Sequence, residues 1–255
     1  MMAVSAEKRL GFLYPDHAAE DDLPWLVETL FPERNVVADV VHTSIGRDEH
    51  TVEALSDTGS RWRLRQGADT LRARHASVAM WACTSGSFVF GLKGAQRQAD
   101  ELAADFGGPA SSTSLAFVSA LGALGIQTVA VAASYPAPLA RHFTGLLAEA
   151  GLSVAHADNH GIFTAAQVGR LADDEVLALA RAADHPEAEA ILVPDTAMHT
   201  VRSVDRAEAS LGKPVLTANQ VSVWEALRLI GALRDEAGLG TLFERANATS
   251  AGLRA

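Results

Sequence analysis

The chain alternates short apolar runs with amphipathic stretches over most of its 255 residues. Short apolar runs bounded by turn-forming residues are typical of buried parallel strands, and amphipathic stretches between them are typical of helices that cover a sheet. Strands are expected at 10–13, 36–41, 78–82, 128–132, 153–155, 190–193 and 214–216. Two of the helices are expected at 139–150 and 223–234. The alternation predicts an α/β fold built on parallel strands.

The order of landmarks repeats in the two halves of the chain. In each half an apolar run ends in Tyr-Pro, at Tyr14-Pro15 and at Tyr135-Pro136. A strand broken by small polar residues follows in each half, at 78–85 and 190–197, and then a proline-containing segment, at 108–113 and 213–218. This order predicts two similar α/β lobes that face one another across a cleft. Chance similarity between βα units is the alternative.

Cys83 is the only cysteine, and it directly follows the expected strand at 78–82. Open α/β sheets bind ligands at the carboxyl ends of their strands, so the thiol is expected in a crevice beside hydroxyl groups and backbone N–H groups. Such donors lower the pKa of a thiol, so Cys83 is expected to be a thiolate nucleophile at neutral pH. The alternative is a buried apolar side chain, because free cysteine is among the most buried residue types.

Asp195 is the residue that the repeat makes equivalent to Cys83. One thiol and one carboxyl on opposite sides of a cleft suit chemistry at a carbon next to a carboxylate, because each group can act on one face of a planar intermediate. A carboxyl is a poor acid at neutral pH unless burial or an anionic substrate raises its pKa. The alternative for Asp195 is a helix N-cap. His42, Asn219 and Gln220 are weaker candidates, for which structural roles are favoured.

Composition narrows the class of partner. The formal charge is −10, from 21 Lys and Arg against 31 Asp and Glu, without a basic cluster, which argues against nucleic acid and acidic membrane surfaces. One cysteine excludes an intramolecular disulfide, and the nine histidines show no zinc-ligand spacing, so no metal site is expected. Residues 1–9 lack the apolar segment of a signal peptide, and no apolar run reaches membrane-spanning length. We therefore expect a cytoplasmic protein with a small-molecule partner.

Three segments together resemble the aspartate/glutamate racemase superfamily. They are Ala82-Cys83-Thr84-Ser85-Gly86-Ser87, Tyr135-Pro136, and Thr217-Ala218-Asn219-Gln220-Val221 leading to Trp224-Glu225-Ala226-Leu227-Arg228. Within that superfamily the chain is most similar to the branch of maleate cis–trans isomerase, arylmalonate decarboxylase and the isomerase-like proteins of ectoine utilisation. The resemblance covers Gly11 to about Gly231.

The resemblance implies two Rossmann-like lobes, each a parallel sheet flanked by helices, related by a pseudo-twofold axis with the active site in the cleft between them. On this basis the first lobe is expected to hold residues 1–116 and about 217–240, the second lobe 117–216, and a C-terminal tail 241–255. The resemblance also implies chemistry without a cofactor and a homodimer or higher homo-oligomer.

The resemblance further implies roles for individual residues. Cys83 matches the cysteine that is an acid/base in racemases and the nucleophile in maleate isomerase. Residues that hold the substrate are then Thr84, Ser85, Tyr135, Thr196 and, at the end of the first strand, Tyr14 and Asp16. Most of the family carries a second cysteine where this chain has Asp195.

That departure excludes a symmetric two-thiol racemase and argues against a decarboxylation that relies on the second cysteine. The first expectation is therefore a cofactor-independent cis–trans isomerase of a small carboxylic acid, in which Cys83 adds to the double bond and Asp195 moves the proton. A racemase or decarboxylase that forms an enediolate is the second hypothesis. A non-catalytic carboxylate-binding accessory protein is the third.

Overall fold

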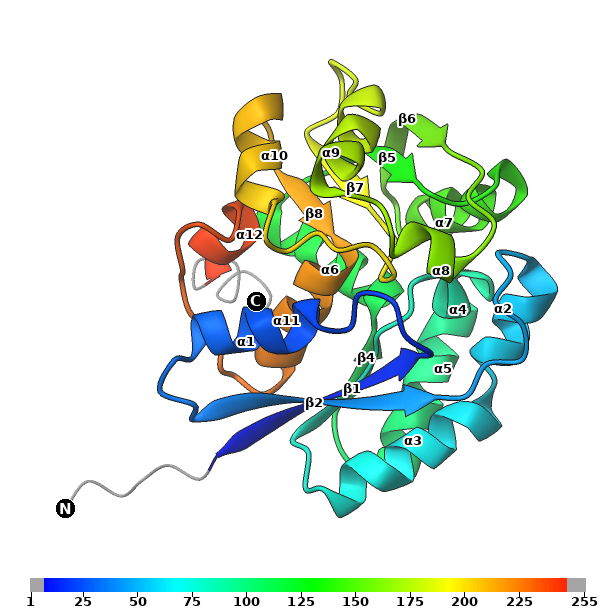
Figure 1. Cartoon of the computed structure of the whole chain (residues 1–255), viewed down its shortest axis with the longest axis vertical. Coiled ribbons are helices and arrows are strands. Elements are labelled where there is room, and N and C mark those ends of the chain that lie inside the picture. Colours follow the sequence, from blue (N-terminus) through cyan, green and yellow to red (C-terminus); the bar gives the residue numbers. More distant parts are fainter. Residues whose placement is uncertain (1–6, 247–255) are drawn as a thin grey trace.

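The computed structural model describes residues 7–246 and contains two four-stranded parallel sheets (Figure 1). The first sheet has the order β2-β1-β3-β4 and the second has the order β6-β5-β7-β8. The strands of the first sheet are β1 (Lys8–Pro15), β2 (Val36–Thr43), β3 (Val78–Trp81) and β4 (Ala110–Ser112). The strands of the second sheet are β5 (Thr128–Ala133), β6 (Ser153–Asn159), β7 (Ala190–Val193) and β8 (Val215–Thr217). Because both sheets follow the same strand order, the prediction of an α/β fold with two similar lobes is confirmed.

All seven expected strands are present, and the central ones are buried on both faces. Every residue of β3 and of β7 is buried, which explains their uninterrupted apolar sequences. The expected list omits β4, because its residues Ala110, Ser111 and Ser112 are small or polar and carry no apolar run. Pairing of Trp81 with Ser112 nevertheless extends the first sheet by this short strand.

Strand register corrects one detail of the repeat. Leu10 pairs with Val78 in the first sheet, and Val129 pairs with Ala190 in the second. Counted from these positions, Tyr135 corresponds to Asp16 rather than to Tyr14. The predicted equivalence of the two Tyr-Pro pairs is therefore wrong, because the chain runs two residues further before the second pair.

The helices cover both faces of the sheets (Figure 1). The first sheet has α1 (Asp22–Leu30) and α11 (Ala218–Leu229) on one face, with α3 (Arg61–Ala73) and α5 (Gly91–Phe106) on the other. The remaining helices are α2 (Val52–Thr58), α4 (Ser85–Phe88), α6 (Thr113–Leu124), α7 (Ala137–Glu149), α8 (Ala165–Val168), α9 (Asp173–Ala182), α10 (Val204–Leu211) and α12 (Thr241–Glu244). No helix within residues 7–246 is long and apolar enough to cross a membrane.

Helix α11 begins at Ala218, immediately after β8, and not at the expected residue 223. Its first turn forms there because the Gln220 side-chain oxygen accepts a hydrogen bond of 3.3 Å from the Thr217 N–H. The helix ends before Gly231, whose φ of 63° is incompatible with helix continuation. The first turn of the helix contains polar residues, so apolar periodicity alone does not predict it.

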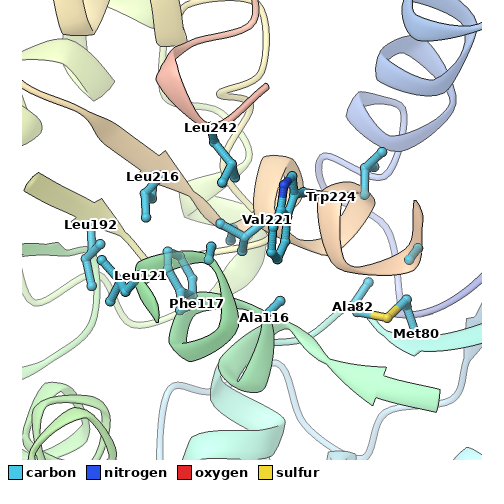
Figure 2. Packing of buried hydrophobic residues seen from close by; sticks show 14 of the residues in the cluster. Met80, Ala82, Ala116, Phe117, Leu121, Leu192, Leu216, Val221, Trp224 and Leu242 are labelled. Atoms are coloured by element: carbon cyan, nitrogen blue, oxygen red, sulfur yellow. The ribbon is translucent and has the colours of Figure 1, made fainter. Parts of the chain in front are cut away.

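The largest apolar core is continuous between the two lobes. Figure 2 shows Phe117 and Leu121 of α6 and Trp224 of α11 in one cluster with Met80 of β3 and Leu192 of β7. Helices α6 and α11, which follow β4 and β8 respectively, contact one another and join the lobes. A common core holds the carboxyl ends of the two sheets in a defined relation.

Helix α12 packs into this core. Within the segment predicted as a C-terminal tail, residues 241–244 form α12, and Leu242 and Phe243 are fully buried. Residues 247–255 of that segment lie outside the described part of the chain. Residues 1–6, which belong to the segment 1–9 where no signal peptide is expected, also lie outside it. The lobe boundaries at 116 and 217 stay a prediction.

Candidate active site

A pocket with about 560 Å³ of empty space opens between the two lobes. Its wall comes from segments that follow β1, β2 and β3 in the first lobe, and from α8 and the segment after β7 in the second. Six of the eight predicted site residues line it: Tyr14, Asp16, Cys83, Ser85, Asp195 and Thr196. The other two, Thr84 and Tyr135, are buried and do not line the pocket.

The turn after β3 places the Cys83 thiol. The Gly86 N–H donates to Cys83 Sγ at 3.3 Å, and Ser85 Oγ lies 3.8 Å from the same sulfur. A Cβ at position 86 would lie 3.0 Å from the Trp81 ring and 3.1 Å from Sγ, so glycine is what allows this N–H to approach the sulfur. The short helix α4 continues from the turn.

The free protein holds Cys83 as a thiol. Its pKa is raised to about 11, mainly by burial and in smaller part by the Asp195 charge, while the Gly86 N–H and the Ser85 hydroxyl act in the opposite direction. The expected thiolate at neutral pH is therefore wrong for the protein without substrate. The donors beside the sulfur are present as predicted, but desolvation outweighs them.

Asp195 is buried and held by two donors. Ser134 Oγ donates to Oδ2, and the Ala197 N–H donates to Oδ1 at 3.0 Å. The following segment is a turn, and the next helix, α10, begins only at Val204. The helix N-cap alternative is therefore wrong, because the carboxylate closes an Asx-type turn instead. Ser134 was not predicted, although its position directly after β5 was a usable signal.

Two tyrosines hold the backbone on both sides of Asp195. The Tyr135 hydroxyl donates to the Pro194 carbonyl at 2.7 Å, and the Tyr14 hydroxyl donates to the Thr196 carbonyl at 2.8 Å. Burial raises the pKa of both phenols, and the charge of Asp195 adds to the effect. Both tyrosines are thus neutral donors that position the carboxylate. Their predicted contact with a substrate stays a prediction.

Asn219 fills a structural role, as favoured from the sequence. Its amide nitrogen lies 3.1 Å from the Thr196 carbonyl and 3.3 Å from an Asp22 carboxylate oxygen. Asp22 also accepts from the Thr200 N–H at 2.8 Å. These contacts tie the segment after β7 to α1 of the first lobe, so the turn that carries Asp195 is braced from outside the pocket.

Three potential metal ligands meet at the rim of the pocket. His17 Nδ1 lies 2.6 Å and His42 Nε2 lies 3.4 Å from Glu20 Oε1, and all ligating atoms of the group are within 4.8 Å of one another. The hydrogen bond to Glu20 raises the pKa of His17. Imidazole and carboxylate are ligands that suit a divalent transition metal. The prediction of no metal site rested on sequence spacing alone and stays a prediction.

Segments of both lobes also meet over the pocket. Asp48, in the loop after β2, accepts from the Ala165 N–H at 2.8 Å and from the Ala166 N–H at 3.2 Å, which caps α8 of the other lobe. The His50 N–H donates to the Phe163 carbonyl at 2.7 Å. Neither Asp48 nor His50 was predicted, and no signal in the sequence pairs them with partners more than 100 positions away.

Fold and pocket together define the class: a two-lobed α/β protein with a thiol and a carboxylate facing one cleft. Residues 29–243 match the family model described as arylmalonate decarboxylase. The match spans most of the chain, so the protein belongs to the arylmalonate decarboxylase family and is an enzyme.

The relatives of this chain include enzymes with two different activities. Arylmalonate decarboxylase of Bordetella bronchiseptica is 26% identical over 196 residues, which are 76% of this chain and 78% of that protein. Maleate isomerase of Nocardia farcinica is 28% identical over 141 residues, which are 55% of this chain and 56% of that protein. A structure of Nocardia farcinica maleate cis–trans isomerase with a covalently bound succinylcysteine intermediate superposes with a TM-score of 0.86 at 22% identity, covering 94% of this chain and 99% of that one.

Proposed function

We propose that the protein is a cofactor-independent cis–trans isomerase of a small unsaturated dicarboxylate, with Cys83 as the nucleophile. The observation that carries the proposal is the presence of Cys83 and Asp195 in one pocket, each two residues beyond the end of an equivalent strand. The maleate isomerase relative and the succinylcysteine structure support a covalent route through a cysteine.

The reaction begins with a neutral thiol beside a carboxylate. Asp195 takes the proton of Cys83 while the sulfur bonds to one alkene carbon and the π electrons move toward the other carbon and its carboxylate. Asp195 then returns the proton to that second carbon, which leaves a saturated thioether. Rotation about the new single bond and reversal of both steps release the trans product and restore the thiol. No proton or electron is gained or lost over the cycle.

The surroundings suit each step. The Gly86 N–H at 3.3 Å stabilises negative charge on the sulfur as it leaves, and Ser85 lies where it can donate to the adjacent substrate carboxylate. Asp195 keeps lone pairs free for a proton, because a carboxylate accepts about four hydrogen bonds and two are used. The two tyrosines and Ser134 keep that carboxylate in place through the cycle.

An enediolate-forming decarboxylase or racemase is the second candidate. Membership of the arylmalonate decarboxylase family and the 26% identical relative favour it. It differs in its products, since it releases carbon dioxide or exchanges the proton at the α-carbon, and needs no bond to sulfur. The proposed isomerase instead forms the trans alkene through a thioether adduct.

The test is conversion of maleate to fumarate, followed by NMR in deuterated water, with intact-protein mass spectrometry of the same samples. We expect conversion by the wild type, with a protein adduct of one substrate mass, and no conversion by Cys83→Ala. Asp195→Asn should form little adduct and little fumarate, because it lacks the base that takes the thiol proton and returns it to carbon. Decarboxylation or exchange without isomerisation would favour the second candidate. Full activity of Cys83→Ala would refute the covalent route.

We further infer that the protein acts in the cytoplasm and as a homodimer or higher homo-oligomer with a small carboxylate as its partner. The inferences of oligomeric state and carboxylate partner rest on the sequence resemblance. Light scattering coupled to gel filtration tests the oligomeric state, and a monomer at working concentration would contradict it.

A further inference from the structure

His50 is a pocket residue that the proposed mechanism leaves without a task. Its side chain is only 6% exposed, yet it lines the same pocket as Cys83, Ser85 and Asp195. It belongs to the loop between β2 and α2 and faces the second lobe across the pocket. A buried imidazole in a ligand pocket is a candidate for binding or proton transfer.

The tautomer of His50 follows from the hydrogen bond of its ring to the second lobe. Nδ1 lies 2.8 Å from the Ile162 carbonyl oxygen, and because a carbonyl only accepts, Nδ1 carries a hydrogen. The ring also stands edge-on to Tyr135, with ring centroids 5.0 Å apart. These two contacts fix the ring plane and leave Nε2 as the ring nitrogen that can bind a ligand.

Nε2 has no hydrogen-bond partner within residues 7–246 and is not sealed off from the pocket. In the neutral ring it is an acceptor, since the hydrogen is on Nδ1. A carboxylate can bind there only when Nε2 also carries a proton, which gives a charge-assisted hydrogen bond.

We propose that His50 binds the second carboxylate of a dicarboxylate substrate through Nε2. The proposal rests on the proposed function, in which the first carboxylate lies at Ser85 next to the attacked carbon. A monocarboxylate offers nothing to Nε2, so His50 selects dicarboxylates.

Arg47, a cationic side chain that also lines the pocket, is already paired with carboxylates. Arg47 lies 3.2 Å from Glu53 and 3.5 Å from Glu49, and its side chain is half exposed. Apolar Ile45 and Leu55 complete this part of the wall. The other ionisable side chains that line the pocket are Tyr14, Asp16, His17, Asp48, Glu49, Cys83 and Asp195. His50 is thus the buried donor available to a distal carboxylate.

The test is calorimetric binding in a Cys83→Ala background, in which neither adduct nor turnover can form. Maleate is the dicarboxylate probe and cis-crotonate is the matched monocarboxylate. We expect maleate to bind and cis-crotonate to bind much more weakly, because the monocarboxylate has no second carboxylate for Nε2.

Two substitutions separate the two nitrogens of His50. His50→Asn places an amide N–H near the position of Nδ1 and removes Nε2, so it keeps the bond to Ile162. We expect maleate affinity to fall about 10- to 100-fold and cis-crotonate affinity to stay unchanged. His50→Gln reaches the position of Nε2 with a neutral donor, so it retains more maleate affinity than His50→Asn.

Unchanged maleate binding by His50→Asn, or an equal loss for both probes, would refute the role of His50, as would the absence of maleate binding in the Cys83→Ala background. The result is separate from that of the proposed reaction. If maleate binding depends on His50 but the wild type forms no fumarate, the isomerase is refuted and the dicarboxylate subsite stands.

Discussion

The protonation of Cys83 gives a quantitative test of the site. Burial places its pKa at about 11, against an ordinary value of 9.0. The difference corresponds to about 3 kcal/mol in favour of the neutral thiol in the folded protein. Only about one molecule in 10,000 then carries a thiolate at neutral pH, roughly 100-fold fewer than for an ordinary thiol.

The assay is the ultraviolet absorbance of the thiolate as a function of pH, taken as the difference between wild type and Cys83→Ala. The chain has one cysteine, so only the wild type can give a thiolate signal, and burial raises the pKa of both tyrosines well above the ordinary value, which separates their ionisation from that of the thiol. We expect a midpoint near 11. Between pH 9 and 11 the folded state binds more protons than the unfolded state, so the wild type loses stability relative to Cys83→Ala by up to about 3 kcal/mol as the pH rises.

A midpoint at or below the ordinary value of 9.0 would refute this reasoning. It would mean that the Gly86 N–H and the Ser85 hydroxyl outweigh desolvation, and that the resting nucleophile is the thiolate predicted from the sequence. Asp195 would then not be needed to take the thiol proton in the first step. The same titration therefore decides between two descriptions of the resting site.

Further predictions concern the residues around the thiol. Asp195→Asn removes a charge that raises the pKa of Cys83, so the same absorbance titration should shift to lower pH, and an unshifted midpoint would contradict the coupling. Gly86→Ala brings a methyl group to 3.1 Å from Sγ and 3.0 Å from the Trp81 ring, so we expect a loss of about 1–3 kcal/mol in urea unfolding and a large drop in turnover, whereas wild-type values would show that the turn adapts. Tyr135→Phe removes the bond to the Pro194 carbonyl and should cost about 1 kcal/mol of stability with reduced kcat; an unchanged kcat would argue against positioning of Asp195 by this tyrosine. Asp22→Ala leaves the Thr200 and Val201 N–H groups unpaired and should lower stability by about 2–3 kcal/mol, measured by urea unfolding, with Asp22→Asn as the milder control.

Much of the architecture was predictable from local pattern. The fully apolar strands at 78–81 and 190–193 marked the centres of the two sheets, and the rule that ligands bind at the carboxyl ends of parallel strands placed Cys83 and Asp195 in the pocket. Helix boundaries were less predictable. Helix α11 starts with buried polar residues, Asn219 and Gln220, which apolar periodicity does not detect.

The sequence by itself determined the alternating elements, their repetition in two lobes and the residues that follow each strand, because these depend on side chains that are neighbours along the chain. Only the tertiary structure decided that the thiol is neutral, that Ser134 holds Asp195, and that His50 spans the cleft to Ile162. The degree of burial sets the protonation of the thiol. The two hydrogen bonds join positions that are 61 and 112 residues apart in the chain. Desolvation and hydrogen bonds between distant positions arise only when the chain folds, which brings Ser134 and Asp195 together within the second lobe and His50 and Ile162 together across the cleft.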